Sequence, residues 1–489
     1  MPEQELIAVR KEKLARLRAH GIDPYPYRFP RTHTAAELHR SFGHLGPGSH
    51  TGQGVAVAGR ILALRRMGRL TFADLHDRSG RIQILAAPQT LGPEAYAFWL
   101  EHLDIGDLVG VRGEVFTTKT GELSVAAQEL VLLAKALRPL PEKWHGLRDV
   151  ETRYRERALD FLANPESRAI LLKRAVILRT LRQYLDARGF IEVETPILQP
   201  IPGGASARPF VTHHNELERD LYLRIAPELY LKRLLVGGLE KVYEIGRNFR
   251  NEGISSEHNP EFTALEAYEA YTDYLGMMEL AEGLIEACVL AVAGSHQIEY
   301  QGRMLDFSRP WRRVPLLELV AEASGCDVEK PLPELLAELE RKGIPVPEHL
   351  RRGPKGKVIE HLLETCAEKE LWHPTFVLDY PVDISPLAKR KRGRPDLTER
   401  FELYIAGKEV ANAFSELNDP EEQRERFLAQ ERLRAQGDEE AQRIDEDFLR
   451  DLELGMPPAG GIGIGIDRLT MILTNAPSIR EVLAFPLLR

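Results

Sequence analysis

The stretch Tyr243–Tyr271, YEIGRNFRNEGISSEHNPEFTALEAYEAY, decides how the rest of the chain is interpreted. Its residues predict a strand that ends near Arg250, a loop that contains Gly253, and a second strand that starts after Pro260. Such a hairpin could hold a guanidinium, an imidazole and an aromatic ring over one ligand, because arginine donates two parallel hydrogen bonds to phosphate and the ring offers a stacking surface. An ordinary charged hairpin with a core phenylalanine is the alternative.

Composition indicates a soluble protein of two or three domains. The chain has 489 residues, 43% of them apolar, without an apolar run of membrane length. Its N-terminus mixes acidic and basic residues and lacks the apolar core of a signal peptide. The three cysteines, Cys288, Cys326 and Cys366, are widely spaced, which predicts reduced thiols in a cytoplasmic protein and not a zinc site. A net charge of −9 argues against bulk attraction to nucleic acid, although a local basic face can still bind it.

The N-terminal part combines a helix with a set of short strands. Residues 3–20 predict a basic amphipathic helix, while residues 32–53 lack periodicity and are interpreted as an irregular approach segment. From Gly54 on, five short alternating strands follow within roughly 85 residues, with a helix near residues 93–102 between the third and fourth. This order is typical of an OB-fold barrel.

An OB-fold barrel binds single-stranded nucleic acid by stacking bases on aromatic side chains. Phe72 is the candidate for stacking, and the nearby polar groups able to read base edges are Arg60, Gln83 and Glu122. For Phe72 taken alone, a place in the core is the alternative.

A larger domain follows the barrel. Pro139-Leu-Pro141 predict a stiff linker. We expect Ser167 to cap a long helix with one apolar stripe, followed by a strand over Phe190–Leu198 that is broken at Pro196. The stretch Leu221–Leu235 changes from strand to helix at Pro227, which leaves Glu228 on the first helical turn.

Two later regions carry many charges. Residues 310–395 contain several short helical patterns and are interpreted as an insertion. Within them, Lys389–Arg394 (KRKRGR) is the strongest basic run, and we expect a solvated, mobile loop there, with a nucleic-acid patch as the alternative.

The C-terminal region holds a charged hairpin and a glycine-rich strand. Residues 400–417 predict a hairpin around Gly407-Lys408 that carries Glu402 and Glu409. Such carboxylates usually face solvent, but opposite nucleotide phosphates they would be magnesium ligands. Residues 460–468, GGIGIGIDR, predict a strand that runs into a helix, and their spacing does not fit the dinucleotide pattern GxGxxG.

These motifs together resemble one family. The opening stretch resembles motif 2 of the class II aminoacyl-tRNA synthetases, in the form found in the lysyl-tRNA synthetases. The segment around Phe190–Leu198 resembles motif 1, which builds the dimer interface of the family, and GIGIGIDRL (461–469) resembles motif 3. The barrel, with KTGELSV (119–125), is similar to the anticodon-binding domain of the aspartyl, asparaginyl and lysyl members.

The resemblance implies an α+β fold class, with an N-terminal OB-fold β-barrel and an antiparallel class II sheet flanked by helices. It implies an enzyme that joins L-lysine to ATP, giving lysyl-adenylate, and transfers lysine to the 3′-terminal adenosine of tRNA(Lys). Mg²⁺ is the implied cofactor, and a cytoplasmic homodimer is the implied assembly. The expected domains are a helical extension (1–50), the barrel (51–137), a linker (138–160) and the catalytic domain (161–489) with a helical insertion at about 310–395.

The resemblance also implies roles for single residues. The expected catalytic residues are Arg250, which would bridge the lysine carboxylate and the α-phosphate, and Arg468. The expected ATP-binding set is Arg250, Glu252, His258, Asn259, Phe262, Glu402, Glu409 and Arg468, with Glu402 and Glu409 as the Mg²⁺ ligands. The expected lysine-binding set is Gly204, Glu228, Glu266, Tyr268, Asn412 and Glu416. The expected contacts to the anticodon are Arg60, Phe72, Gln83 and Glu122.

Charge favours lysine as the amino acid. Three carboxylates suit a substrate with two ammonium groups, whereas a site for aspartate would need a cation, and the matched positions contain none. An aspartyl- or asparaginyl-tRNA synthetase and a non-catalytic OB-fold nucleic-acid-binding paralogue are the alternatives. A paralogue that lysylates protein would lack the barrel.

Overall fold

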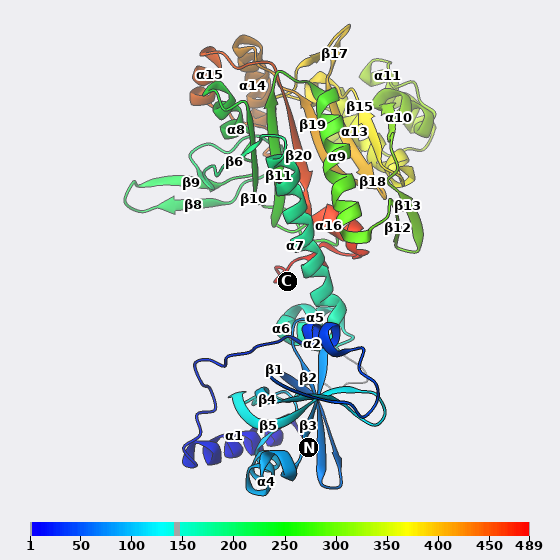
Figure 1. Cartoon of the computed structure of the whole chain (residues 1–489). Coiled ribbons are helices and arrows are strands. Elements are labelled where there is room, and N and C mark those ends of the chain that lie inside the picture. Colours follow the sequence, from blue (N-terminus) through cyan, green and yellow to red (C-terminus); the bar gives the residue numbers. More distant parts are fainter. Residues whose placement is uncertain (1, 141–146, 489) are drawn as a thin grey trace. The chain divides into compact units, whose positions relative to one another are not determined.

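The computed structural model describes residues 2–140 and 147–488, which form two compact units, residues 1–148 and 149–489 (Figure 1). Of the predicted linker at 138–160, Pro141 and residues 142–146 lie outside the described residues, and its C-terminal part carries helices from residue 150 on. The predicted domain boundaries therefore stay a prediction.

The first unit is a closed five-stranded barrel in the order β1-β2-β3-β5-β4, as an OB fold requires. Its apolar side chains alternate inward and form one core with α1 and α2. The predicted helix between the third and fourth strands is present as α4. The elements of this unit are α1 (Glu3–Ala19), α2 (Ala35–Phe42), β1 (His50–Met67), β2 (Leu70–His76), β3 (Arg81–Ala86), α3 (Pro88–Leu91), α4 (Pro93–His102), β4 (Leu108–Thr117) and β5 (Leu123–Ala134).

The expectation of an irregular segment at 32–53 is wrong in its middle, where helix α2 lies. Thr34 is its N-cap and accepts a hydrogen bond from the backbone of Glu37, whose carboxylate in turn accepts from the backbone of Thr34 at 2.7 Å. This reciprocal capping box is readable as T-x-x-E in the sequence, and it stabilises a helix that is too short to show periodicity.

The second unit is built on an eight-stranded sheet in the order β14-β15-β18-β19-β20-β11-β10-β6. Its strands are antiparallel except for the two outer pairs, β14 with β15 and β10 with β6. Helices α7 and α9 lie along one face of the sheet (Figure 1), and their apolar stripes share one core with it. The strands are β6 (Ile191–Glu192), β10 (Lys241–Phe249), β11 (Glu261–Ala270), β14 (Arg312–Pro315), β15 (Thr375–Leu378), β18 (Arg400–Ile405), β19 (Lys408–Ser415) and β20 (Ala459–Gly465).

The remaining elements surround this sheet. A three-stranded sheet, β7-β9-β8, extends from it as a narrow arm (Figure 1). The helices are α5 (Val150–Arg155), α6 (Arg157–Ala163), α7 (Pro165–Asp186), α8 (Glu228–Val236), α9 (Tyr274–Ala293), α10 (Leu316–Ser324), α11 (Leu332–Arg341), α12 (Glu348–Arg351), α13 (Lys355–Leu362), α14 (Pro420–Ala435), α15 (Glu446–Glu453), α16 (Ile466–Thr474) and α17 (Ile479–Val482). Single turns of π- and 3₁₀-helix lie at Leu363–Ala367, Glu368–Glu370 and Val382–Ile384. The other strands are β7 (Leu198–Gln199), β8 (Val211–His214), β9 (Arg219–Leu223), β12 (Gln297–Tyr300), β13 (Arg303–Asp306), β16 (Arg390–Lys391) and β17 (Arg394–Thr398). No helix of the described residues is long and apolar enough to cross a membrane.

Two expectations at the start of this unit need correction. Ser167 does not cap α7, since the helix begins at Pro165 after Asn164, and Ser167 is buried where its hydroxyl accepts a hydrogen bond from Arg153 at 3.0 Å. Proline favours the first helical position, so the Asn-Pro pair was the better start signal. The single strand expected over Phe190–Leu198 is two short strands, β6 and β7, in different sheets.

The region at 310–395 is also more ordered than expected. Strands β14 and β15 fall inside the predicted insertion but belong to the central sheet, and helices α10 to α13 lie between them. The basic run at 389–394 is not a mobile loop, because it forms the hairpin β16-β17. Its cations pair with acidic residues from other segments, including Arg390 with Glu422 and Arg392 with Asp273, each at 2.7 Å.

Candidate functional site

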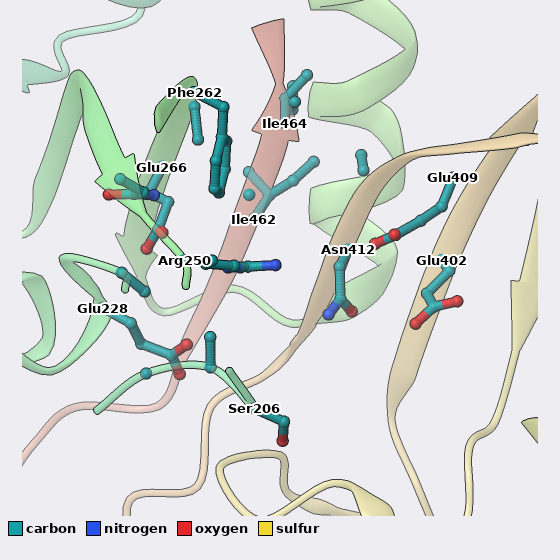
Figure 2. Close-up of a pocket in the computed structure, with 18 of the residues that line it drawn as sticks. Ser206, Glu228, Arg250, Phe262, Glu266, Glu402, Glu409, Asn412, Ile462 and Ile464 are labelled. Carbon is teal, nitrogen blue, oxygen red and sulfur yellow. The ribbon is translucent and has the colours of Figure 1, made fainter. Parts of the chain in front are cut away.

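A cavity of about 430 Å³ opens over the middle of the central sheet (Figure 2). Strands β11, β18, β19 and β20 form its floor, and the loop at 204–206, the start of α8 and helix α13 form its walls. Thirteen of the fourteen residues predicted to bind the amino acid or the nucleotide line it. They are Gly204, Glu228, Arg250, Glu252, His258, Asn259, Phe262, Glu266, Tyr268, Glu402, Glu409, Asn412 and Arg468.

Arg250 lies in the centre of this cavity. It follows the end of β10 and is held by its backbone N–H, which donates to Pro260 O at 2.9 Å. Its guanidinium carbon lies 5.0 Å from the centre of the Phe262 ring. In Figure 2 the guanidinium extends between Glu228 and Glu266 on one side and Asn412, Glu402 and Glu409 on the other. The buried Nε has no hydrogen-bond partner among the described residues, so the guanidinium has an unused donor.

One end of the cavity is basic and carries His258 and Arg468. The Arg468 guanidinium donates to Glu409 O at 2.8 Å and to Glu409 Oε2 at 3.1 Å, and its other nitrogen lies 3.2 Å from His258 Nε2. Burial and the neighbouring Arg468 lower the pKa of His258. A neutral imidazole whose Nε2 accepts from Arg468 fits this arrangement.

The opposite end is acidic. Glu228 starts α8, and β11 places Glu266 and Tyr268 two residues apart on one face, where the Tyr268 hydroxyl donates to Glu266 Oε2 at 3.1 Å. Burial raises the pKa of Glu266 to about 8, and the nearby Glu228 carboxylate adds to this effect. Gly204 has φ +89°, and a Cβ there would lie 2.9 Å from the Cβ of Glu228. The loop can therefore approach Glu228 only as glycine.

Glu416 is the predicted residue that does not line the cavity. Its side chain is 0% exposed and lies behind Gly461, and its Oε2 is 2.5 Å from the ammonium of Lys232. Lys232 is itself fully buried and also pairs with Glu228 at 2.8 Å. The matched positions themselves contain no cation, as expected from the sequence, but Lys232 lies directly behind them. The spacing of four between Glu228 and Lys232 on one helix was the available signal.

The carboxylates expected to bind metal lie on facing strands and both line the cavity. Glu402 accepts from Arg400 at 2.7 Å through one oxygen, and from the hydroxyls of Tyr404 at 2.7 Å and Tyr380 at 2.8 Å through the other. Glu402 is buried, contrary to the usual solvent-facing position of a hairpin carboxylate. Within residues 2–140 and 147–488 no group of three or more acidic, histidine or cysteine side chains could hold a metal by itself. The pair fits Mg²⁺ that takes its other ligands from phosphate, since the first Glu402 oxygen keeps a free lone pair.

Comparisons with known proteins identify the family. Residues 149–489 match the family model described as tRNA synthetases class II (D, K and N), and residues 55–133 match an OB-fold nucleic acid binding domain. The chain belongs to the class II tRNA synthetases. It is 55% identical to the lysine–tRNA ligase of Pelotomaculum thermopropionicum over 99% of this chain and 95% of the relative. The lysine–tRNA ligases of Moorella thermoacetica (55%; 100% and 98%) and Thermosynechococcus vestitus (52%; 99% and 97%) are similar over comparable lengths. The α+β fold class with an OB barrel is thereby confirmed.

The barrel of this synthetase carries the remaining predicted residues on its outward face. Phe72 opposes Arg65 and Leu85 in the sheet, and its neighbour on the same face, Asp74, opposes Gln83. Three of the predicted polar groups already have partners. Arg60 donates to Gly106 O at 2.7 Å, Gln83 accepts from Ser124 at 3.0 Å, and Glu122 pairs with Arg81. The sequence argument missed Asp74, which links Arg65 and Arg81.

The sequence argument also missed several lining residues of the synthetase cavity. They are polar or charged: Asn248, Glu257, Lys357, Glu360, Arg400 and Gln442. Asn248 and Glu257 lie within the stretch that resembles motif 2, and Arg400 starts the predicted hairpin at 400–417, so their places beside predicted site residues were the available signal. The other three come from segments without a motif, and only tertiary folding brings them to the cavity.

Proposed function

We propose that this synthetase is a lysine–tRNA ligase, which activates L-lysine with ATP to lysyl-adenylate and transfers lysine to the 3′-terminal adenosine of tRNA(Lys). One observation carries the proposal: a half-buried arginine, whose buried Nε has no partner among the described residues, lies between an acidic and a basic end of one cavity. The acidic end suits a diamine and the basic end suits a triphosphate. The full-length relatives that are named lysine–tRNA ligases support the same substrates.

The first step joins two anions, so it requires charge neutralisation and positioning more than a base. A lysine carboxylate oxygen attacks the α-phosphorus, a P–O bond forms, and the bond to the pyrophosphate leaving group breaks. Arg250 is placed between the two ends, where its donors neutralise both the carboxylate and the α-phosphate. His258 and Arg468 hold the β- and γ-phosphates, and Phe262 stacks on the adenine ring, whose edge Glu252 and Asn259 contact. Mg²⁺, when it is bound by Glu402 and Glu409, screens the triphosphate charge.

The acidic end selects the amino acid. Glu228 binds the α-ammonium group beside Gly204, and Glu266 binds the ε-ammonium together with Tyr268, while Glu416 adds its charge from behind the pocket wall. Asn412, which opposes Glu402 in the sheet, orients the amino acid. Burying a carboxylate without a counter-charge costs free energy, so a substrate with two ammonium groups binds this pocket more tightly than a substrate with one positive charge.

The pKa of Glu266 makes lysine binding dependent on pH. Because this pKa is raised to about 8, the carboxyl is largely protonated at neutral pH in the free protein. An ammonium ligand favours the ionised form, so binding releases a proton, and we expect the affinity for lysine to increase as pH rises towards 8. Calorimetry of lysine binding in buffers of different ionisation enthalpy measures this release. The Glu266→Gln variant should release no proton when lysine binds. An unchanged proton release in that variant would contradict the assignment of the pH dependence to Glu266.

The barrel binds the anticodon through stacking on Phe72, with Arg60, Gln83 and Glu122 at the base edges. We expect Phe72→Ala to lower kcat/KM for tRNA about tenfold or more, because stacking of one base contributes about 1–3 kcal/mol. Aminoacylation assays with varied tRNA measure this effect. Lysine-dependent exchange of pyrophosphate into ATP needs no tRNA and is the control. An equal loss in both assays would show that Phe72 supports the fold and does not contact the anticodon.

The assembly we propose is a homodimer in the cytoplasm. Apolar side chains are exposed along the segment that resembles motif 1 and along the arm beside it: Leu172, Ile191, Ile197, Leu198 and Val211. An interface formed by these segments would cover these side chains. A cytoplasmic location agrees with the free cysteines.

The test of the function is amino-acid-dependent exchange of pyrophosphate into ATP, with each of the twenty amino acids and with Mg²⁺. We expect exchange with lysine and its loss when Mg²⁺ is removed by a chelator. Exchange with aspartate or asparagine instead would overturn the assignment of the pocket. Absence of pyrophosphate exchange with every amino acid would overturn the proposed activity.

A further inference from the structure

Lys232 is a buried cation that no step above uses. It lies on α8, one turn after Glu228, and its side chain is 0% exposed. Its ammonium is 2.8 Å from Glu228 Oε1 and 2.5 Å from Glu416 Oε2, and it lies 5.3 Å from the centre of the Phe414 ring. Glu228 and Phe414 line the cavity whereas Lys232 does not, so its ammonium lies behind the pocket wall.

The charges around this ammonium are suited to a dication. Glu228, Glu266 and Glu416 supply three carboxylates, and Lys232 is paired with two of them. If all four groups are charged, two negative charges remain, which equals the positive charge of the two ammonium groups of lysine. A buried net charge is unfavourable, so this count sets which ligand charge the pocket accepts.

We propose that Lys232 is a positioning residue for the amino acid, whose ammonium holds Glu228 and Glu416 in place and in their charged form without touching the substrate. The inference deepens the proposed function and rests on it.

The environment of the two carboxylates explains why they need this cation. Burial raises the pKa of Glu228, and it raises the pKa of Glu416 well above its usual value, while Lys232 is the strongest opposing influence on both. The other groups that face the pair are Glu266 and Tyr268 on β11 and, acting on Glu228, Arg400 on β18. Without Lys232 the pKa of both carboxyls would rise further, and a protonated carboxyl binds an ammonium group weakly.

The test uses two variants of the full-length protein. Lys232→Met removes both the charge and the hydrogen bonds, whereas Lys232→Gln keeps an amide that can donate to the carboxylates but has no charge. In lysine-dependent exchange we expect both variants to raise KM for lysine about tenfold or more, because hydrogen bonds to charged groups are stronger than those between neutral groups. We expect KM for ATP to change less than about threefold. In Lys232→Gln, KM for lysine should fall with rising pH more steeply than in the unchanged protein, since carboxyls with a further raised pKa regain their charge only at higher pH.

A matched control lies in the other unit. Lys135 is also 0% exposed and is 2.5 Å from Asp104 and 2.8 Å from Asp107. Lys135→Met removes a buried lysine from a similar pair of carboxylates, and it should lower the thermal midpoint without changing KM for lysine. Thermal unfolding of all variants separates loss of folded protein from loss of binding.

The outcomes are distinct. A raised KM for lysine in Lys232→Gln, with KM for ATP retained, supports the inference. An unchanged KM for lysine in Lys232→Gln overturns it and leaves the proposed function intact, as does an equal rise in KM for both substrates. Absence of lysine-dependent exchange in the unchanged protein overturns the proposed function and the inference with it.

Discussion

Arg250→Ala should lower the rate of lysine-dependent exchange of pyrophosphate into ATP by about 10²-fold or more, because removal of one preorganised donor to a developing charge has an effect of that size. The guanidinium lies between the acidic and basic ends of the cavity, and its buried Nε has no partner among the described residues. A buried N–H group without a hydrogen-bond partner is free to donate to a ligand that enters the cavity. The loss should appear in kcat, since charge accumulates at the α-phosphate only as the new bond forms.

The control for this prediction is Arg247, on β10 three residues before Arg250. Its side chain is 44% exposed and lies 3.5 Å from Glu261, outside the residues that line the cavity. Arg247→Ala should therefore leave exchange within about twofold of the unchanged protein, because exposed ion pairs contribute little. Near-normal exchange in Arg250→Ala would show that other groups neutralise the α-phosphate.

The hairpin that carries Arg250 was predictable from sequence because its signals are local. Pro260 and the glycine and serines of the loop mark where the strands end, and β10 and β11 pair from Lys241 with Glu269 to Phe249 with Glu261. Alternation and turn residues likewise predicted the barrel strands, and Pro227 predicted the start of α8. Short-range steric preferences decide these features, and tertiary contacts do not override them.

The errors arise where partners come from distant segments. The basic run at 389–394 was expected to be a solvated, mobile loop. It is exposed, but it forms a hairpin, and Asp273 and Glu422 from distant segments pair with its cations. Glu416 was placed at the substrate, yet the end of β19 brings it against Lys232 on α8, and the pair is buried together. Neither contact has a signature in a single sequence, because residue spacing alone does not specify which distant side chains meet.

Gly461→Ala is expected to be the most damaging change at the acidic end. Gly461 opposes Tyr268 and Phe414 in the sheet, and a Cβ there would lie 2.5 Å from the Tyr268 ring and closer still to Glu416 Oε1. Tyr268 is 3% exposed and Glu416 is tied to Lys232, so neither side chain has room to move. Overpacking of this kind costs about 1–3 kcal/mol, which corresponds to a rise in KM for lysine of roughly 5- to 150-fold.

Exchange assays with varied lysine measure this rise, and Gly54→Ala is the control. Gly54 is also a strand glycine, in β1, but a Cβ there would meet no atom within 4 Å, so KM for lysine should not change. If Gly461→Ala kept its KM for lysine, Tyr268 and Glu416 would have to move freely, and the acidic end could not be a preorganised site. If KM for ATP rose instead, the glycine would serve the nucleotide. The expected pattern follows from position along one strand, because β20 starts beside Glu416, whose backbone N–H donates to Ala459 O at 2.8 Å, and Arg468 follows the end of β20.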